Sequence, residues 1–435
     1  MDEVIYDAIV IGGGPGGSTT ATYLARAGKR VLLLEKEKFP RFHIGESLLP
    51  YTQSLFEEMG VLPALEVAGF PRKLGAQFHL GNGTKSVKFI FKNGCYTRDT
   101  QTFQVERAKF DHILLQHAAK CGAEVREGWT VNTFTNTPGQ VTVQADSTDG
   151  KSETFRGKFL IDATGRDNLT GNKEKTREIY PNHKKLAVFG HFEDVKLDDG
   201  GPGGDTVIIR LANKWFWIIP VSQTKTSVGI VMERGEFANS KESPAEQFNR
   251  VWQSSRVLRD RLTNAKLVSE ILVTSDFSYF NKRLVGPRLM RIGDAAGFLD
   301  PIFSSGVFLA MYSGKLAANV VIKAVKANSD GTAAMARYEK TVFRALKVYW
   351  DLVEGFYTRP FLEVFFEPRN KWNLPDAVVA LLAGELEGGW KIRWRMRVFY
   401  WLIKLQGRRP FLPRISFVDT STPITEVNKR LVNKA

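Results

Sequence analysis

A glycine-rich turn near the N-terminus constrains the fold of this 435-residue chain more than any other feature. Gly12, Gly14 and Gly17 lie between an apolar run at 5–11 and a helix-like segment at 18–27. The first glycine permits a tight turn, the second lets a pyrophosphate approach the backbone, and the third lets the helix pack against the strand. This spacing predicts a Rossmann-type βαβ unit that binds a dinucleotide.

Residues beside the turn complete the predicted nucleotide site. A second apolar run at 31–35 ends in Glu35, which is placed to accept hydrogen bonds from ribose hydroxyls. The free N–H groups at the helix start, around Pro15 and Ser18, are expected to face the phosphates. Lys36 follows the acidic residue directly and joins the predicted cofactor-binding set.

Two later segments favour FAD over a nicotinamide cofactor. Residues 162–165 (DATG) and 293–294 (GD) each follow a buried strand and resemble the flavin fingerprints of aromatic hydroxylases. The resemblance implies that Asp294 bonds the ribityl chain, that Arg107 lies near the cofactor, and that a helix at 297–316 points its N-terminus at the flavin. No second GxGxxG occurs, so we expect no nicotinamide site, and a separate flavin reductase as the source of reduced FAD.

The predicted fold class is therefore α/β, an aromatic-hydroxylase-like FAD-binding fold with an inserted mixed β-sheet and a helical C-terminal cap. We expect a discontinuous FAD-binding module at 1–325 and a helical region at 326–435. The inserted β-sheet substrate region is expected at about 70–105 and 180–280, where apolar and polar residues alternate.

Two finer expectations concern single segments. Residues 86–91 and 100–105 are predicted strands of antiparallel type around a turn at Gly94. We expect no membrane-spanning helix, because no stretch of the sequence reaches the roughly 18 apolar residues that such a helix needs.

Composition narrows the classes of partner. The formal net charge is +15, and residues 369–435 carry 13 Lys or Arg against 5 Asp or Glu, which favours anionic partners.

The two cysteines lie far apart and the six histidines do not cluster, so neither a disulfide framework nor a metal site is expected. The N-terminus lacks the pattern of a signal peptide, and we expect a cytoplasmic protein. No nucleic-acid recognition motif accompanies the charge.

Four features, which occur in the same order along the chain as in that family, resemble the flavin-dependent halogenases over about residues 5–320. They are the loop FPRFHIGESLLP at 39–50, the signature WFWIIP at 215–220, the signature FLDPIFSSG at 298–306, and Lys73, which lies where that family keeps its catalytic lysine. A lysine taken alone in a basic chain is typical of a solvated surface. The position of Lys73 relative to the other three segments is what assigns it a role.

The resemblance implies FADH2- and O2-dependent halogenation, in which a flavin hydroperoxide oxidises chloride or bromide to hypohalous acid and Lys73 captures or hydrogen-bonds that acid. Backbone N–H groups of Ser305 and Gly306 are expected to hold the halide, as an anion nest does. Bulky residues are expected to keep the substrate away from the flavin, and the predicted barrier is Trp215, Trp217 and Phe303. The resemblance further assigns these residues to cofactor binding: Glu46, Ser47, Pro301, Gly306 and Val307.

One departure from the tryptophan-halogenating branch points to the substrate. That branch carries a glutamate immediately before its S-x-G segment, whereas this chain carries Phe303. The segment resembles instead the branch that acts on phenols and pyrroles, in some cases tethered to an acyl-carrier protein. With no glutamate there, another group must orient the substrate and take the ring proton. His79 and Glu46 are candidates by sequence position alone, and a structural role is the favoured interpretation of both.

Alternatives remain open from the sequence. A flavin monooxygenase that hydroxylates an aromatic ring is one, and a geranylgeranyl-reductase-like oxidoreductase is another. The basic aromatic stretches at 344–368 and 390–404 fit a cap over the substrate pocket, a docking face for an acidic carrier protein, or contact with a membrane surface, which is the less favoured option.

Overall fold

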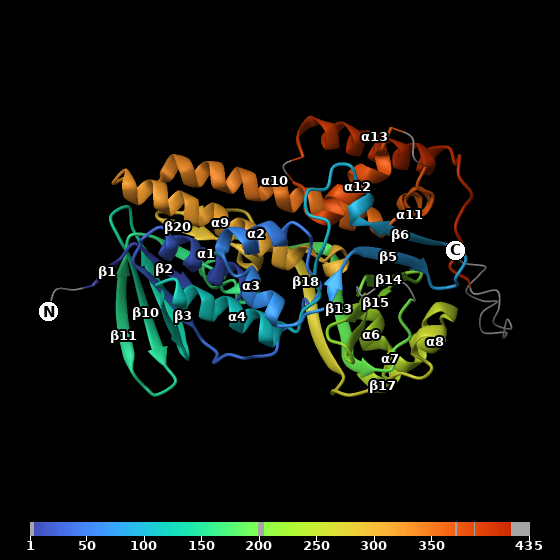
Figure 1. Cartoon of the computed structure of the whole chain (residues 1–435), viewed down its shortest axis with the longest axis horizontal. Helices are drawn as coiled ribbons and strands as arrows, with labels where there is room; N and C mark the ends of the chain where they lie inside the picture. Colours follow the sequence, from blue (N-terminus) through green and yellow to red (C-terminus); the bar gives the residue numbers. More distant parts are fainter. Residues whose placement is uncertain (1–3, 199–203, 370–371, 387, 419–435) are drawn as a thin grey trace.

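The computed structural model describes residues 4–198, 204–369, 372–386 and 388–418 (Figure 1). The glycine turn lies within a six-stranded sheet of order β19-β20-β12-β2-β3-β8. Its strands are parallel except for the edge strand β19. The strand bounds are β2 (Ala8–Ile11), β3 (Val31–Glu35), β8 (Glu124–Glu127), β12 (Leu160–Asp162), β19 (Val285–Gly286) and β20 (Leu289–Arg291).

The central strands of this sheet are buried on both faces, as their continuous apolar runs predict. Ala8 and Val10 face a core shared with the helices, whereas Ile9 and Ile11 face a second core shared with a smaller sheet. The helices on the first face are α1 (Pro15–Arg26), α4 (Arg107–Lys120) and α9 (Ser305–Lys326). The smaller sheet has the order β1-β11-β10-β9, with β1 (Ile5–Tyr6), β9 (Trp129–Asn136), β10 (Val141–Ser147) and β11 (Ser152–Gly157).

A nine-stranded mixed sheet forms the second half of the molecule, as the predicted insertion requires (Figure 1). It runs β21-β18-β13-β16-β15-β14-β5-β6, with β17 paired to β13. It is mixed because β14 and β5, far apart in the chain, pair in parallel. The strand bounds are β5 (Gly75–Leu80), β6 (Ser86–Ile90), β13 (Arg177–Glu193), β14 (Thr206–Arg210), β15 (Trp215–Pro220), β16 (Thr226–Glu233), β17 (Lys266–Leu267), β18 (Leu272–Asn281) and β21 (Gly297–Phe298). One of its faces is covered by α6 (Arg234–Ser240), α7 (Pro244–Gln253) and α8 (Arg256–Leu262).

The pairing expected around Gly94 is wrong. Strand β6 pairs with β5, and the chain then enters a short 3-10 helix, η1 (Phe91–Asn93). The later segment is reduced to β7 (Thr102–Phe103), which pairs with β4 (Arg72–Lys73). The segment between η1 and β7 is too long for a tight hairpin, so each strand takes a partner elsewhere. Short helices α2 (Thr52–Met59), α3 (Leu62–Val67) and α5 (Leu169–Lys173) belong to the half that contains the glycine turn, where they contact α1, α4, α9 and the 3-10 turn after β20.

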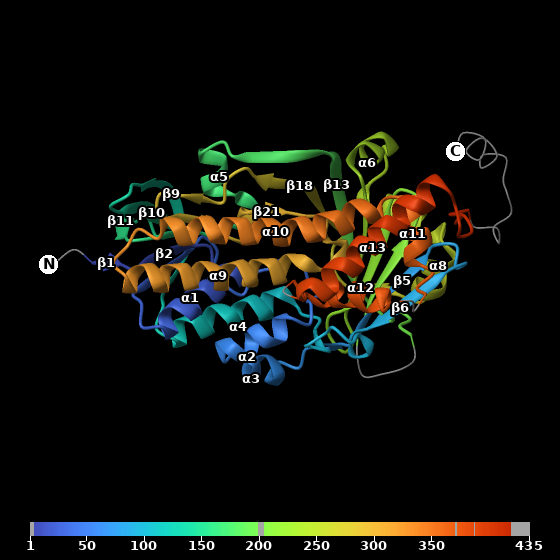
Figure 2. The same ribbon diagram turned by 90° about the horizontal axis from the view of Figure 1, so that it is seen from above.

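The C-terminal region is mainly helical up to Arg408, as predicted, and residues 419–435 lie outside the description. Helix α10 (Thr332–Phe356) runs beside α9 (Figure 2). Three further helices lie at the β5–β6 end of the large sheet (Figure 1). They are α11 (Arg359–Phe365), α12 (Leu374–Ala383) and α13 (Gly389–Arg408).

Two expectations about the segment after Asp294 need correction. The helix begins at Ser305 rather than 297, because the chain first forms the 3-10 turn η3 (Gly293–Ala295), strand β21 and the 3-10 turn η4 (Pro301–Phe303). The resulting helix α9 is long and apolar enough to cross a membrane, contrary to expectation. However, 67% of its apolar stretch is buried within the protein, as in the core helix of a globular fold.

The tightest constraint on the βαβ unit is the contact between α1 and the glycine turn. A Cβ on Gly17 would lie 1.9 Å from the carbonyl oxygen of Gly12. We expect Gly17→Ala to push the helix off the turn, to destabilise the fold by about 1–3 kcal/mol and to weaken flavin retention. Thermal unfolding and the visible absorbance of protein-bound flavin measure both effects.

Gly235→Ala is the matched control, because a Cβ there meets no atom within 4 Å and the residue lies in helix α6. This variant should unfold at the wild-type temperature or slightly above it. Equal behaviour of the two variants would contradict the role given to Gly17.

Candidate functional site

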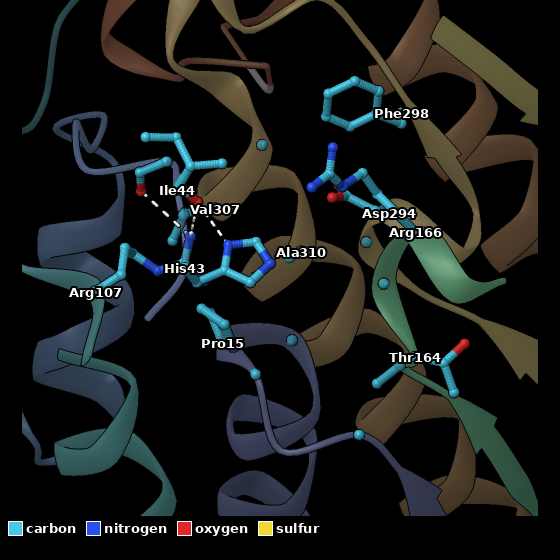
Figure 3. A pocket seen from close by; sticks show the side chains of 18 of the residues that line it. Pro15, His43, Ile44, Arg107, Thr164, Arg166, Asp294, Phe298, Val307 and Ala310 are labelled. Atoms are coloured by element: carbon cyan, nitrogen blue, oxygen red, sulfur yellow. Dashed lines mark hydrogen bonds between the residues drawn. The ribbon is translucent and has the colours of Figure 1, made fainter. Parts of the chain in front are cut away.

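A cavity of about 640 Å³ extends from the glycine turn to strand β15. This volume lies within the range of roughly 300–1,000 Å³ usual for cofactor sites. Figure 3 shows His43, Arg107, Pro15 and Val307 on one side of the cavity and Asp294 with Arg166 on the other. The sequence-predicted residues that line it are Gly12, Gly14, Pro15, Glu35, Lys36, Glu46, Ser47, Arg107, Trp215, Trp217, Asp294, Pro301, Gly306 and Val307.

Glu35 organises the end of the cavity nearest the turn. Its Oε2 accepts a hydrogen bond from the Gly13 N–H at 2.5 Å, and its Oε1 accepts one from the Glu37 N–H at 2.9 Å. A carboxylate has about four acceptor positions, so capacity remains for sugar hydroxyls. Lys36 pairs with Asp167 at 2.5 Å at the exposed rim.

Gly17 and Ser18 do not line the cavity. The Ser18 hydroxyl donates to the Gly13 carbonyl at 2.8 Å, and Gly17 fits against Gly12. Both residues therefore act by shaping the turn from behind.

Arg107 fixes the loop that covers the cavity. Its guanidinium forms two hydrogen bonds of 2.8 Å with Asp111 and one of 2.7 Å with the Ile44 carbonyl. The residue is buried at the start of α4, not exposed on the surface of the helix. His43, which sequence reasoning missed, hydrogen-bonds the Ile44 carbonyl through Nδ1 at 2.6 Å, and burial lowers its pKa to about 3. The loop therefore presents a neutral imidazole beside a charged guanidinium.

Asp294 lies beside Arg166 in the cavity (Figure 3). Burial raises the pKa of Asp294 to about 6, while Arg166 acts in the opposite direction. Arg166 also donates to the Thr274 hydroxyl at 3.1 Å, so the turn after β12 and strand β18 meet at this point. Sequence reasoning missed Arg166, although it follows the DATG turn directly.

The lining fits FAD. Glycine backbone forms a cradle without side chains, and Glu46 presents a buried Oε2 that has no hydrogen-bond partner among the described residues. The other oxygen of Glu46 lies 2.7 Å from Nε2 of His191. An unpartnered buried carboxylate oxygen is costly unless a bound group hydrogen-bonds it. No group of three metal-ligating side chains occurs in the described ranges.

Strand β15 forms the far wall of the cavity. Trp215, Trp217 and Ile219 line it, whereas Phe216 and Ile218 face the core under α7 and α8. This is the predicted alternation along a strand.

The Trp215 indole is fixed by a buried chain of hydrogen bonds that the sequence did not reveal. Its Nε1 donates to the Tyr357 hydroxyl at 2.8 Å, and that hydroxyl donates to Asp300 Oδ2 at 2.7 Å. Asp300 Oδ1 accepts from the Ile302 N–H at 3.2 Å in η4. Burial raises the pKa of the Asp300 carboxyl. One buried chain therefore connects the wall, the FLDPIFSSG turn and the end of α10.

Lys73 lies beyond the wall, in a second and much smaller cavity of about 10 Å³. Three residues, Thr206, Ile208 and Ser304, line both cavities, so the amine lies next to the junction between them. Phe303 also lines the small cavity and therefore lies on the lysine side of the barrier.

The environment of the amine is almost free of charge. Lys73 is 2% exposed, and its Nζ donates to Ser47 Oγ and to the Leu48 carbonyl, each at 2.9 Å. The pairing of β4 with β7 fixes its backbone opposite Thr102. Burial lowers its pKa from 10.5 to about 7, with Asp205 acting weakly in the opposite direction.

Neither sequence candidate for a partner of Lys73 is next to it. Ala76 and Phe78 of β5 line the small cavity, so His79 lies on the opposite face, where burial lowers its pKa to about 4. Glu46 points into the large cavity towards His191. The polar neighbours are instead Ser47 and the Thr206 hydroxyl, which lie 2.7 Å apart.

The predicted halide site lies at the start of α9. Ser304 adopts the left-handed conformation, with φ of 56°, and turns the chain into the helix. Gly306 lines the large cavity, and a Cβ there would meet no atom within 4 Å, so its backbone borders open space. Ser305 is buried and lines neither cavity with its side chain. The halide role of both amides stays a prediction.

Comparison with known proteins identifies the family. The family model for the FAD binding domain matches residues 5–354. The chain is 33% identical to the 1H-pyrrole-2-carbonyl peptidyl-carrier-protein chlorinase of Pseudomonas fluorescens, covering 89% of this chain and 91% of the relative. It is 32% identical to the corresponding brominase of Pseudoalteromonas luteoviolacea, covering 89% and 94%.

Among solved structures, the flavin-dependent brominase Bmp2 matches with a TM-score of 0.82 and 29% identity, over 93% of this chain and all of that one. These relatives do not favour the hydroxylase and reductase alternatives. The chain belongs to the flavin-dependent halogenases, and it is an FAD-dependent halogenating enzyme.

Proposed function

We propose that this enzyme halogenates an electron-rich ring, pyrrolic or phenolic, that is carried as a thioester on a peptidyl carrier protein, and that Lys73 transfers the halogen. The observation that carries the proposal is the position of Lys73: a buried amine, with a pKa near 7, at the junction of two cavities. Similarity to two enzymes named for carrier-bound pyrrole supports the choice of substrate. We also propose that a separate flavin reductase supplies the reduced cofactor.

Bound in the large cavity, reduced FAD with O2 supplies the oxidising power that converts chloride or bromide into hypohalous acid. The residues of this chain arrange the rest. The start of α9 holds the halide through backbone N–H groups at Ser305 and Gly306. Trp215 and Trp217 keep the organic ring away from the flavin, so oxygen is not transferred to it directly.

The hydrogen bonds of Lys73 suit a nucleophilic amine. A neutral amine has two N–H donors and one lone pair, and Ser47 and Leu48 supply two acceptors. The lone pair is then available to attack the halogen of hypohalous acid. The N–halogen bond forms as the halogen–oxygen bond breaks, and the departing hydroxide takes a proton from the nitrogen to leave as water.

The ring completes the cycle. An electron-rich carbon attacks the halogen, the N–halogen bond breaks with its electrons returning to Nζ, and the nitrogen takes up the proton that the ring loses. The small cavity of about 10 Å³ holds no ring, so the surrounding side chains, including Phe303 and Leu382 of α12, must move when substrate binds.

The proposal is tested with purified enzyme, a flavin reductase, bromide and a carrier domain loaded with pyrrole-2-carbonyl. Wild-type enzyme is expected to add the mass of bromine, not of oxygen. Lys73→Met should abolish bromination in the active site while flavin oxidation continues, and the oxidising equivalents should escape as free hypobromous acid and hydrogen peroxide. The variant should also unfold at a higher temperature near neutral pH, because a buried amine that prefers to be charged in the unfolded chain is removed.

Lys173→Met is the control, because that lysine donates to the Phe134 carbonyl and lines neither cavity. It should brominate as the wild type does. A hydroxylated product from the wild type would refute the proposed reaction, and bromination by Lys73→Met would remove the lysine from it.

The pH dependence follows from the lowered pKa of Lys73. If the neutral amine is the nucleophile, kcat/KM for bromination rises as the pH rises through about 7. Asp205 raises this pKa by its charge, so Asp205→Asn should move the rising limb to lower pH. A limb that falls as the pH rises would mean that the ammonium form acts instead. A limb that moves to higher pH in Asp205→Asn would contradict the effect given to the Asp205 charge.

The buried chain of hydrogen bonds through Tyr357 predicts a separate effect, on the fraction of flavin oxidation that leads to halogenated product. Tyr357→Phe removes the hydroxyl that joins Trp215 to Asp300, so the wall and the η4 turn lose their connection. We expect more hydrogen peroxide per flavin oxidised and a raised KM for bromide. The loss of stability should be about 1–3 kcal/mol for each buried group left unpaired.

Tyr338→Phe in α10 provides the comparison, because its buried hydroxyl donates to the Arg291 carbonyl at 2.6 Å and does not contact the wall. It should lose stability but keep the wild-type ratio of peroxide to product. The same ratio in both variants would show that Tyr357 only stabilises the fold.

A further inference from the structure

One exposed stripe of helix α13 combines tryptophan and cationic side chains. Its six residues are spaced three or four apart, so they share one face of the helix. They are Trp390, Arg393, Arg397, Trp401, Lys404 and Arg408, all exposed. Trp390 and Trp401 are 67% and 58% exposed, although an isolated monomer gains nothing from presenting so much indole to water.

The charge of this stripe is uncompensated. Helix α13 contains no Asp or Glu, and the four cations of the stripe form no ion pair within the described part of the chain. Surface cations in this protein commonly pair with a neighbouring carboxylate, as Lys347 does with Asp351. The stripe therefore presents a local positive field that attracts an acidic partner.

The opposite face of α13 is already used by the protein itself. Ile392, Met396 and Phe399 are buried, and the Phe399 ring lies 5.6 Å from that of Phe361 in α11. A buried hydrogen bond of 2.6 Å from Gln406 to Glu363 anchors the end of the helix to α11. The stripe is thus held on a fixed helix, and its exposure is not a consequence of poor packing.

The stripe lies on the side from which a substrate must reach Lys73. The small cavity meets the FAD cavity through Thr206, Ile208 and Ser304, and Leu382 of α12 closes it towards the C-terminal helices. Helix α13 packs on α11 and α12 and forms the outer layer of this region (Figures 1 and 2). A tethered ring that does not pass through the flavin site therefore arrives beneath α13.

We propose that the Trp390–Arg408 stripe is the docking face for the acidic carrier protein that delivers the substrate. The inference rests on the proposed function, because it names where the carrier binds. Arg393, Arg397 and Lys404 steer the acidic surface, and the two tryptophans supply buried contact area once the partner covers them.

A membrane surface fits the same helix less well. An amphipathic helix that lies on a bilayer inserts its apolar face into the lipid, with the cations at its edges. In α13 the apolar face is buried against α11, so the stripe that remains outside is mainly cationic. A protein partner with a carboxylate-rich helix matches this pattern of two aromatic anchors among four charges.

The test compares one substrate in two forms, pyrrole-2-carbonyl on a peptidyl carrier domain and the pantetheine thioester of the same acid. Arg393→Glu/Arg397→Glu is expected to raise KM for the carrier-bound form about tenfold or more, with kcat and the kinetics of the thioester unchanged. Trp401→Ala should act in the same direction. The effect should shrink at high salt, since the charges act through water.

The matched control is Lys323→Glu/Lys326→Glu, which changes the net charge equally at the far end of α9. It should leave both substrates unaffected. Equal KM values for the carrier-bound form in wild type and the Arg393→Glu/Arg397→Glu variant would overturn the proposal. So would wild-type binding to phosphatidylserine vesicles that the variant loses while carrier kinetics stay unchanged.

A direct binding measurement separates this inference from the reaction itself. The fluorescence anisotropy of a labelled carrier domain gives its affinity for wild type and variant without turnover. Loss of affinity in the variant alone supports the docking face even if no ring is halogenated, which would refute the proposed function only. Unchanged affinity refutes the docking face.

Discussion

The burial of the Lys73 amine is the constraint on which the rest of the structure depends. Lys73 is almost completely buried, and the surroundings that lower its pKa contain two neutral hydrogen-bond acceptors and an aromatic ring 5.8 Å from the nitrogen. Such a site costs stability, so the fold must hold the amine there by other contacts. The pairing of β4 with β7 fixes the backbone of Lys73. Leu382 of helix α12 lines the small cavity around its side chain.

A second constraint is the separation of two reacting partners within one enzyme. The flavin cavity and the Lys73 cavity share three lining residues, while the tryptophans of β15 face only the flavin cavity. The proposed reaction requires a small oxidised halogen species to pass this junction while the ring stays on the lysine side. The two cavities follow from the two sheets. The six-stranded sheet carries the glycine turn that binds the cofactor, and the nine-stranded sheet carries strand β15, which forms the wall.

Sequence reasoning reached the parts of the site that depend on local pattern. The glycine turn, Glu35 and the alternation of Trp215, Trp217 and Ile219 follow from the periodicity of one strand or one turn. Lys73 was found through its register relative to other motifs, since nothing in its neighbouring residues distinguishes it from a surface lysine. Sequence position alone does not decide whether His79 faces Lys73, because the choice of strand face depends on where β5 pairs.

The parts that escaped prediction join residues far apart in the chain. Trp215 and Tyr357 are separated by 142 positions, and Tyr357 and Asp300 by 57, so no local pattern reports their hydrogen bonds. The same holds for the reassigned strand β7 and for α12, whose Leu382 closes the lysine cavity. Side chains placed by tertiary contacts alone are invisible to periodicity.

The buried chain through Tyr357 also explains why the C-terminal helices belong to the active site and are not an appended cap. Tyr357 follows directly after α10, and its hydroxyl fixes both the flavin wall and the turn that leads into the proposed halide-binding end of α9. Helices α11 and α12 continue from it, and α12 closes the space above Lys73. A partner that moves these helices to admit a ring therefore pulls on the same residue that holds Trp215. The proposed docking on α13 would then be physically linked to the flavin barrier through Tyr357, because the segment that must yield to substrate begins where the wall is anchored.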